Sequence, residues 1–160
     1  MTVFRAAIVK PLTRKSGAMK KLSLLIFCSL LSLTSFAQTE LELIQETLTD
    51  YIEGTANGEP DRLQKAFHPD FNLYTVIGDD SLRVWNGQDY ISGFQEGRKS
   101  NRVGRIISID HENDAAIAKV EIVMPNRGVY TDYFLLLKLK EGWKIIHKTY
   151  TGRAFYGNQE

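Results

Sequence analysis

The chain has 160 residues, of which 43% are hydrophobic and 24% are charged, and its formal net charge is +1. This length and composition suit a single folded domain and exclude a disordered or fibrous chain. Residues 38–160 hold fourteen of the twenty basic residues and all nineteen acidic ones, so this part alone carries a net charge of −5. An acidic domain lacks the electrostatic footprint of a nucleic-acid-binding protein, and we expect no nucleic-acid partner.

Residues 1–37 have the features of an N-terminal extension followed by a secretory signal peptide. After Met19, two lysines precede a leucine-rich run over residues 22–33, and small residues for cleavage follow before residue 38. The run is shorter than the about 20 residues that span a bilayer, which favours a cleaved signal over a retained anchor. We expect Met19 to be the true start, a long basic leader being the alternative. Residues 38–160 would then form one exported domain, periplasmic or secreted, without membrane contact after cleavage.

The first part of this domain predicts two helices. Apolar residues recur at three- and four-residue spacing over residues 41–52 with polar residues between them, which is typical of an amphipathic helix. Asn57-Gly58 supplies a left-handed stop, and a proline at residue 60 suits the first turn of a second helix over 60–67. His68 precedes a proline and is therefore disfavoured in a helix, so we expect the second helix to end there.

Strands dominate the rest of the chain. Residues 71–76 and 81–85 alternate as a short strand pair, and a third helix is expected over residues 86–97. Two long hairpins follow, over residues 102–124 and 129–151, each with a turn sequence at its centre.

The predicted register of the hairpins assigns side chains to faces. In the first hairpin, pairing across Asn113-Asp114 places Arg105 as the single charge on an inward apolar face. In the second, pairing residue 139 with Trp143 places Tyr133, Trp143 and His147 on a face that we expect to line a cavity. The opposite face, which includes Phe134, retains four large apolar side chains, so we expect a homodimer through it.

Three motifs carry a resemblance to a known family: "AFHPDF" after the second helix, "WNGQDYISGF" at the third, and "EGWKIIHK" in the last hairpin. With the order of elements, they resemble the nuclear transport factor 2-like superfamily. Over residues 40 to 153 the chain looks most like the small secreted bacterial proteins of the putative lumazine-binding family. The resemblance implies a cystatin-like α+β fold, with a cone-shaped curved antiparallel sheet wrapped around N-terminal helices, commonly dimeric. The superfamily contains isomerases, dehydratases and cyclases beside proteins without chemistry, so this fold does not fix the function.

The residues of an isomerase site are not found in this sequence. By approximate alignment to such enzymes, the position of the base falls at about Thr75 and that of the second acid near Leu135, and neither residue is acidic. His147 is the better acid/base candidate because its predicted face lines the cavity, and His68, near the cavity mouth, is the second candidate. A neutral core role for His147, and a turn role for His68 beside Asp70, are the simpler alternatives.

Three functions remain open, with no cofactor expected. The first is an exported protein that binds a flat, largely apolar small molecule in the cavity, and the second is a cyclase, dehydratase or isomerase-like enzyme that uses His147. The third is a protein-interaction module whose cavity is filled by side chains. No metal site is expected, because the three histidines lie on separate elements and the single cysteine lies in the signal. The predicted ligand-binding residues are Tyr51, Trp85, Tyr90, Arg105, Tyr133, Trp143 and His147.

Overall fold

The computed structural model describes residues 38–155, so the predicted start at Met19 and the signal peptide lie outside the described part. The elements are α2 (Glu40–Asn57), α3 (Pro60–Ala66), β1 (Phe67–Ile77), β2 (Ser81–Asn86), α4 (Gly87–Ser92), β3 (Val103–Glu112), β4 (Ala115–Met124), β5 (Gly128–Leu139) and β6 (Gly142–Arg153). This order confirms the predicted α+β class. The third helix ends five residues earlier than expected, at Ser92.

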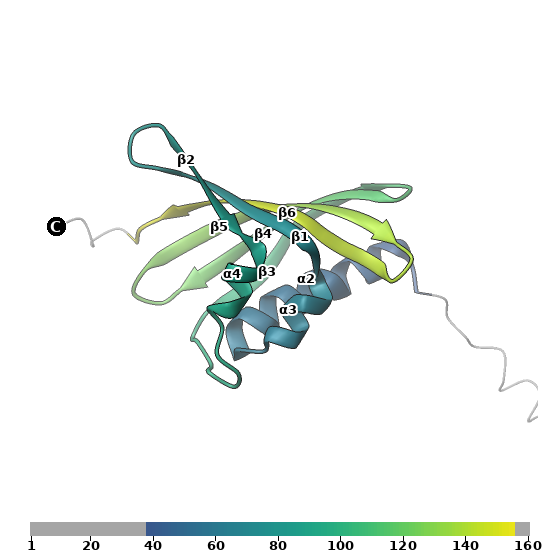
Figure 1. Cartoon of the computed structure of the whole chain (residues 1–160), viewed down its shortest axis with the longest axis horizontal. Coiled ribbons are helices and arrows are strands. Elements are labelled where there is room, and N and C mark those ends of the chain that lie inside the picture. Colours follow the sequence, from purple (N-terminus) through teal and green to yellow (C-terminus); the bar gives the residue numbers. More distant parts are fainter. Residues whose placement is uncertain (1–37, 156–160) are drawn as a thin grey trace, which may run out of the picture. The chain divides into compact units, whose positions relative to one another are not determined.

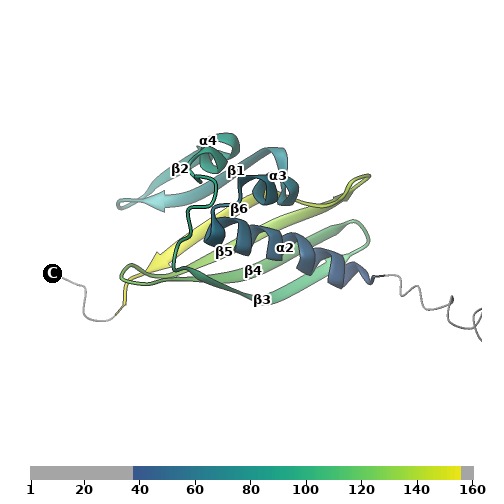
Figure 2. The same ribbon diagram turned by 90° about the horizontal axis from the view of Figure 1, so that it is seen from below.

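The six strands form one sheet in the order β2-β1-β6-β5-β4-β3. The prediction of an antiparallel sheet needs a correction, because β1 runs parallel to β6 and the sheet is therefore mixed. The sheet arches over the three helices, which all lie on one side of it (Figure 1). Figure 2 looks onto this helix-covered side. We call it the concave face, and the opposite side the convex face.

Helix α2 begins at a capping box and ends where its sequence predicts. Thr39 and Glu42 form a capping box, in which the Thr39 hydroxyl accepts from the Glu42 amide and the Glu42 carboxylate accepts from the Thr39 amide. Gly58 ends the helix in the left-handed conformation, at φ 66°. Its apolar side is fully buried against the sheet at Ile44 and Leu48, so the amphipathic pattern gives the orientation of the helix correctly.

A β-bulge in β3 changes the face on which its first residues lie. Near the turn the predicted register holds, with Ile109 opposite Ala118. Beyond Ile107 the pairing shifts by one residue, so Arg105 lies opposite Glu121. Because side chains alternate between faces, one inserted residue moves every residue before it to the other face. Arg105 is therefore on the convex face, and its predicted inward position is wrong.

A second bulge has the same effect in β6. Trp143 pairs with Lys138 rather than with residue 139, and the predicted register is restored only at His147, opposite Leu135. The extra residue is Ile146. Trp143 therefore lies on the concave face and His147 on the convex face, although the unbroken alternation predicts that they share one.

The face proposed from the sequence for a homodimer is also assigned wrongly. Phe134 and Leu136 are each 1% exposed and belong to the main core under the helices. The apolar side chains that remain exposed on β5 are Tyr133, Leu135 and Leu137, on the convex face. The face predicted for dimerisation is thus already covered by the protein's own helices.

Core side chains fill one end of the concave face. Phe67 stacks on Phe71 at 3.9 Å between ring centroids, and Tyr51 packs edge-on against Phe134 at 4.9 Å. At the end near the β5–β6 turn, the Trp143 indole donates to Glu40 at the start of α2, at 2.8 Å. Among residues 38–155, no helix has the length and apolar character that crossing a membrane requires.

Candidate functional site

The other end of the concave face is hollow. A cavity of about 290 Å³ lies there, at the lower end of the range of small-molecule pockets in proteins. Two helices and five strands contribute to its wall. The lining residues are Tyr51, Leu73, Trp85, Tyr90, Arg102, Ile122, Met124, Arg127, Tyr130, Asp132, Lys148 and Tyr150.

Three polar side chains meet at the floor of the cavity. The Tyr51 hydroxyl donates to Asp132 Oδ2 at 2.5 Å, and Lys148 Nζ donates to the Tyr51 oxygen at 3.0 Å. Lys148 Nζ also lies 3.3 Å from Asp132 Oδ1, and the two side chains are only 5% and 3% exposed. Buried charges persist in proteins when they are paired and hydrogen-bonded, and each of these groups has both kinds of partner.

The surroundings keep the lysine and the tyrosine protonated. Burial by itself lowers the pKa of Lys148, but Tyr90, Asp132 and Tyr150 together outweigh burial and raise this pKa above its ordinary value. Burial, followed by the charge of Asp132, raises the pKa of Tyr51 well above 10. The floor therefore presents an ammonium group and a neutral phenol at neutral pH. In this protonated form Lys148 is a cation and a hydrogen-bond donor.

Aromatic rings surround the ammonium group. Lys148 Nζ lies 5.0 Å from the ring centroid of Tyr51 and 5.1 Å from those of Tyr90 and Tyr150. A cation within about 6 Å of a ring face is stabilised by the ring quadrupole. The rings thus support the buried charge and also offer flat walls to a planar ligand.

Trp85 supplies a polar group that has no partner. Its indole Nε1 is buried and, within the described residues, is the single buried side-chain nitrogen or oxygen without a hydrogen bond. Trp85 lines the cavity from β2, and the Arg83 guanidinium lies 4.2 Å from its ring centroid. A buried donor left unpaired costs about 1–3 kcal/mol, so a ligand that accepts from it would recover this cost.

The structure brings together three of the seven predicted ligand-binding residues. Tyr51, Trp85 and Tyr90 line the concave cavity. Trp143 is on the same face but is 4% exposed and closes the filled end. Tyr133 is 49% exposed on the convex face. The prediction that all seven share one cavity is therefore wrong.

The other two residues are separated from the cavity by the bulges described above. On the convex face, Arg105 Nε donates to Glu121 at 3.0 Å, and this guanidinium holds the pKa of Glu121 below its ordinary value. His147 Nδ1 accepts from the Asn72 amide at 3.3 Å, and its ring packs edge-on against Tyr74. An Nδ1 that accepts this bond carries no proton, so neutral His147 is protonated at Nε2.

His68 has the local role that its turn sequence suggests. Its Nδ1 accepts from the Asp70 amide at 3.2 Å, and the Asp70 carboxylate is 3.9 Å away. Neither His68 nor His147 lines the concave cavity. The two histidines proposed as acid/base groups therefore lie away from the buried polar cluster.

Asp132 and Lys148 are the central site residues that sequence reasoning missed, and it missed Arg102 and Arg127 as well. The first two were assigned to the face proposed for dimerisation, where charged residues seemed solvated. One signal was available: in strands that pair with each other, Asp132 has Tyr130 and Phe134 two residues away on either side, and Lys148 has Ile146 and Tyr150. Such a pair in a buried ribbon favours a paired interior charge over a solvated one.

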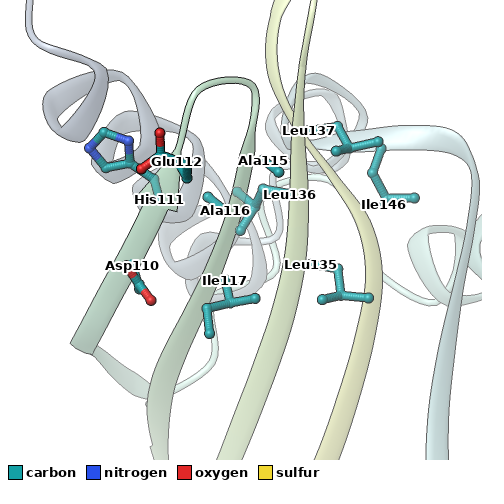
Figure 3. Close-up of a pocket in the computed structure, with 10 residues that line it drawn as sticks. All are labelled: Asp110, His111, Glu112, Ala115, Ala116, Ile117, Leu135, Leu136, Leu137 and Ile146. Carbon is teal, nitrogen blue, oxygen red and sulfur yellow. The ribbon is translucent and has the colours of Figure 1, made fainter.

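The convex face carries two larger hollows, of about 420 and 350 Å³. Figure 3 shows the first, where Ile117, Leu135 and Leu137 project from β4 and β5 while the helices lie behind the sheet. The first hollow is lined mainly by aliphatic side chains of an open sheet face, and the lining of the second includes Tyr133 and His147, two of the residues predicted from the sequence. We place the candidate site in the smaller concave cavity, because buried charges, aromatic rings and an unpaired donor converge there.

No group of three or more histidine, cysteine or acidic side chains suited to a metal ion is found in the part of the chain that the structure describes.

A model of the family described as putative lumazine-binding matches residues 39–151 of the chain. No curated protein matches the chain.

Solved structures show the same fold. An NTF2-like protein of unknown function from Methylobacillus flagellatus is 27% identical, with 75% of this chain and 97% of that chain covered and a TM-score of 0.64. One from Shewanella baltica is 24% identical, with 73% and 98% covered and a TM-score of 0.64. A domain of unknown function with a cystatin-like fold, from Nostoc punctiforme, is 13% identical, with 76% and 82% covered and a TM-score of 0.58. These structures support the NTF2-like fold that the sequence motifs predict.

Proposed function

The chain belongs to the putative lumazine-binding family of NTF2-like proteins, and from this premise we propose that it binds a small, flat molecule in its concave cavity. The family supports a ligand-binding role, and the cavity is the place where ligand-binding groups converge. The observation that carries the proposal is the unpaired indole N–H of Trp85, buried beside an aromatic wall. The site is more polar than the largely apolar one expected from the sequence, because it contains Asp132 and Lys148.

Binding without chemistry fits this geometry better than catalysis. Asp132 accepts from Tyr51 and pairs with Lys148, so both of its oxygens are occupied. Lys148 stays protonated, and the two candidate histidines lie outside the cavity. A general base must come within hydrogen-bond reach of a substrate proton, and Asp132 is 2% exposed and enclosed by Tyr51 and Lys148.

Native mass spectrometry of the purified protein tests this proposal. A small molecule should co-purify with the chain, and Trp85→Phe should lower its occupancy by removing the donor while keeping an aromatic ring. Trp143→Phe is the matched control, because the Trp143 indole is bonded to Glu40 at the filled end of the fold. Full occupancy in Trp85→Phe, or a loss of equal size in both variants, would contradict the proposed site.

We further propose that the protein is an exported homodimer, assembled through the convex face. Support comes from exposed apolar side chains that continue across β3, β4 and β5, each 41–54% exposed. They are Ile107, Ile117, Tyr133, Leu135 and Leu137. Soluble monomers rarely leave so continuous an apolar surface uncovered. The mass of the chain purified from the exporting cell tests the export proposal, since it should begin at residue 38.

A further inference from the structure

We propose that the ligand is a planar aromatic anion, whose ring lies against the tyrosines and Trp85 while its acidic group is bound at the cavity mouth by Arg102 and Arg127. This inference rests on the proposed function and names the chemical class of the ligand. It follows from three features of the cavity: the charges at the floor, the charges at the mouth, and the hydrogen-bonding groups of the wall.

The floor of the cavity is electrically balanced. The carboxylate of Asp132 and the ammonium group of Lys148 neutralise one another at 3.3 Å, and Tyr51 takes the second carboxylate oxygen. Asp132 is the single carboxylate of the lining. A cationic ligand would therefore find no free acceptor there.

The mouth has positive charge without a balancing carboxylate. Arg102 and Arg127 both line the cavity, and within residues 38–155 neither forms an ion pair. The guanidinium group of Arg102 donates from Nε to Ser100 at 3.0 Å and lies 5.6 Å from the ring centroid of Phe94, which leaves its two terminal nitrogens for a ligand. The guanidinium group of Arg127 is on an exposed residue of the β4–β5 turn.

Strand register places the two arginines at the same end. Arg127 directly precedes Gly128, which pairs with Met124, and Arg102 directly precedes Val103, which pairs with Val123. Asp132 is four residues along β5 from Gly128, which corresponds to roughly 13 Å at about 3.3 Å per residue. The cavity is therefore elongated, with a neutral floor, aromatic walls and a cationic mouth. A ligand with an aromatic ring and an acidic group matches this arrangement, with its ring between the aromatic walls and its acidic group at the mouth.

Two kinds of group in the lining can only donate hydrogen bonds, beside tyrosine hydroxyls that both donate and accept. The indole N–H of Trp85 can only donate, and guanidinium groups likewise donate without accepting. An acceptor-rich ligand satisfies both, through an oxygen or nitrogen on the ring and through the oxygens of its acidic group. Arginine binds such oxygens with charge-assisted hydrogen bonds, the stronger kind.

The test uses 2-naphthylacetate and its uncharged amide, 2-naphthylacetamide, which have nearly the same shape. Calorimetry gives the dissociation constants, and the indole ¹H–¹⁵N resonance of Trp85, assigned with Trp143→Phe, shows whether a probe occupies the cavity. Arg127→Gln and Arg102→Gln remove the mouth charges one at a time. Lys140→Gln is the control, because it makes the same change in net charge at the β5–β6 turn, at the opposite end of β5.

We expect the acid to shift the Trp85 resonance and to bind at least about tenfold more tightly than the amide. This difference corresponds to one charge-assisted contact that the amide does not make. Each arginine variant should weaken binding of the acid by about tenfold and leave binding of the amide unchanged. Lys140→Gln should change the affinity for neither probe. If both probes shift Trp85 with equal affinity, or if the arginine variants bind the acid unchanged, the ligand is not an anion and the proposed cavity still stands. If neither probe shifts Trp85, both this inference and the proposed function are overturned.

Discussion

The buried Lys148–Asp132 pair offers the sharpest test of the structure, through the substitution Lys148→Met. Methionine keeps most of the side-chain volume and adds no polar atom, so the main change is the loss of a charge. Asp132 then remains 3% exposed beside Tyr51 with no cation near it. A buried carboxylate left without its counter-charge is strongly destabilising.

The magnitude follows from the distance in the structure. At 3.3 Å and an effective dielectric constant of about 20, the attraction between the two charges is roughly 5 kcal/mol. Part of this is offset, because the variant no longer has to desolvate an ammonium group. We therefore expect Lys148→Met to lower the free energy of unfolding by about 3–5 kcal/mol. That is a large fraction of the 5–15 kcal/mol typical of a domain.

Urea denaturation followed by circular dichroism measures this loss. The double variant Asp132→Asn/Lys148→Met removes both charges and keeps an acceptor for Tyr51, so it should recover at least about 2 kcal/mol relative to Lys148→Met. Lys138→Met is a matched control on the neighbouring strand. Its ion pair with Glu40 is shorter, at 2.5 Å, but exposed, so its removal should change the stability much less.

One result would refute the reasoning. If Lys148→Met and Lys138→Met cost the same, and the double variant recovers nothing, the two floor residues do not form a buried charge pair. The balanced floor from which the ligand class is inferred would then be lost as well.

Three further predictions concern other parts of the molecule. The free energy of unfolding should fall above about pH 10. The pKa values of Tyr51 and Lys148 are raised in the folded protein, so the unfolded chain releases these protons first. In Tyr51→Phe this fall should be less steep, by up to about 1.4 kcal/mol per pH unit. Leu135→Glu on the convex face should convert the dimer to a monomer in sedimentation velocity, whereas Leu41→Glu, at a similarly exposed position of α2, should not. In thermal unfolding, Gly87→Ala should destabilise the fold by about 1–3 kcal/mol, because its Cβ would meet a phenylalanine ring at 2.3 Å. Gly93→Ala is the control and should be nearly neutral, because the nearest contact of its Cβ is 3.3 Å.

Much of the fold follows from local patterns in the sequence. The amphipathic spacing of α2, the left-handed stop at Gly58 and the helix start at Asn86 are all confirmed. The Asn86 side chain accepts from the amides of residues 88 and 89, as an N-cap residue does. These features depend on neighbours within a few residues, which a sequence displays directly.

The faces of the long strands could not be obtained in this way. Alternation with a period of two predicts a face only while the pairing is unbroken, and the bulges at Ile107 and Ile146 each reverse it. An extra residue in one strand is defined by its partner strand, so no local pattern marks it. Arg105 was misplaced, and Trp143 was wrongly put on the same face as His147, for this reason.

The sequence by itself determined the α+β class, the element order and the family resemblance, because these depend on periodicity, turn residues and short motifs. Tertiary structure alone decided which side chains share the cavity. Tyr51 lies 81 residues from Asp132 and 97 from Lys148, and their meeting depends on how a helix packs on two paired strands. A charged residue in a strand looks the same in the sequence whether its side chain faces water or a partner in the core. Only the packing of the other elements distinguishes these two cases.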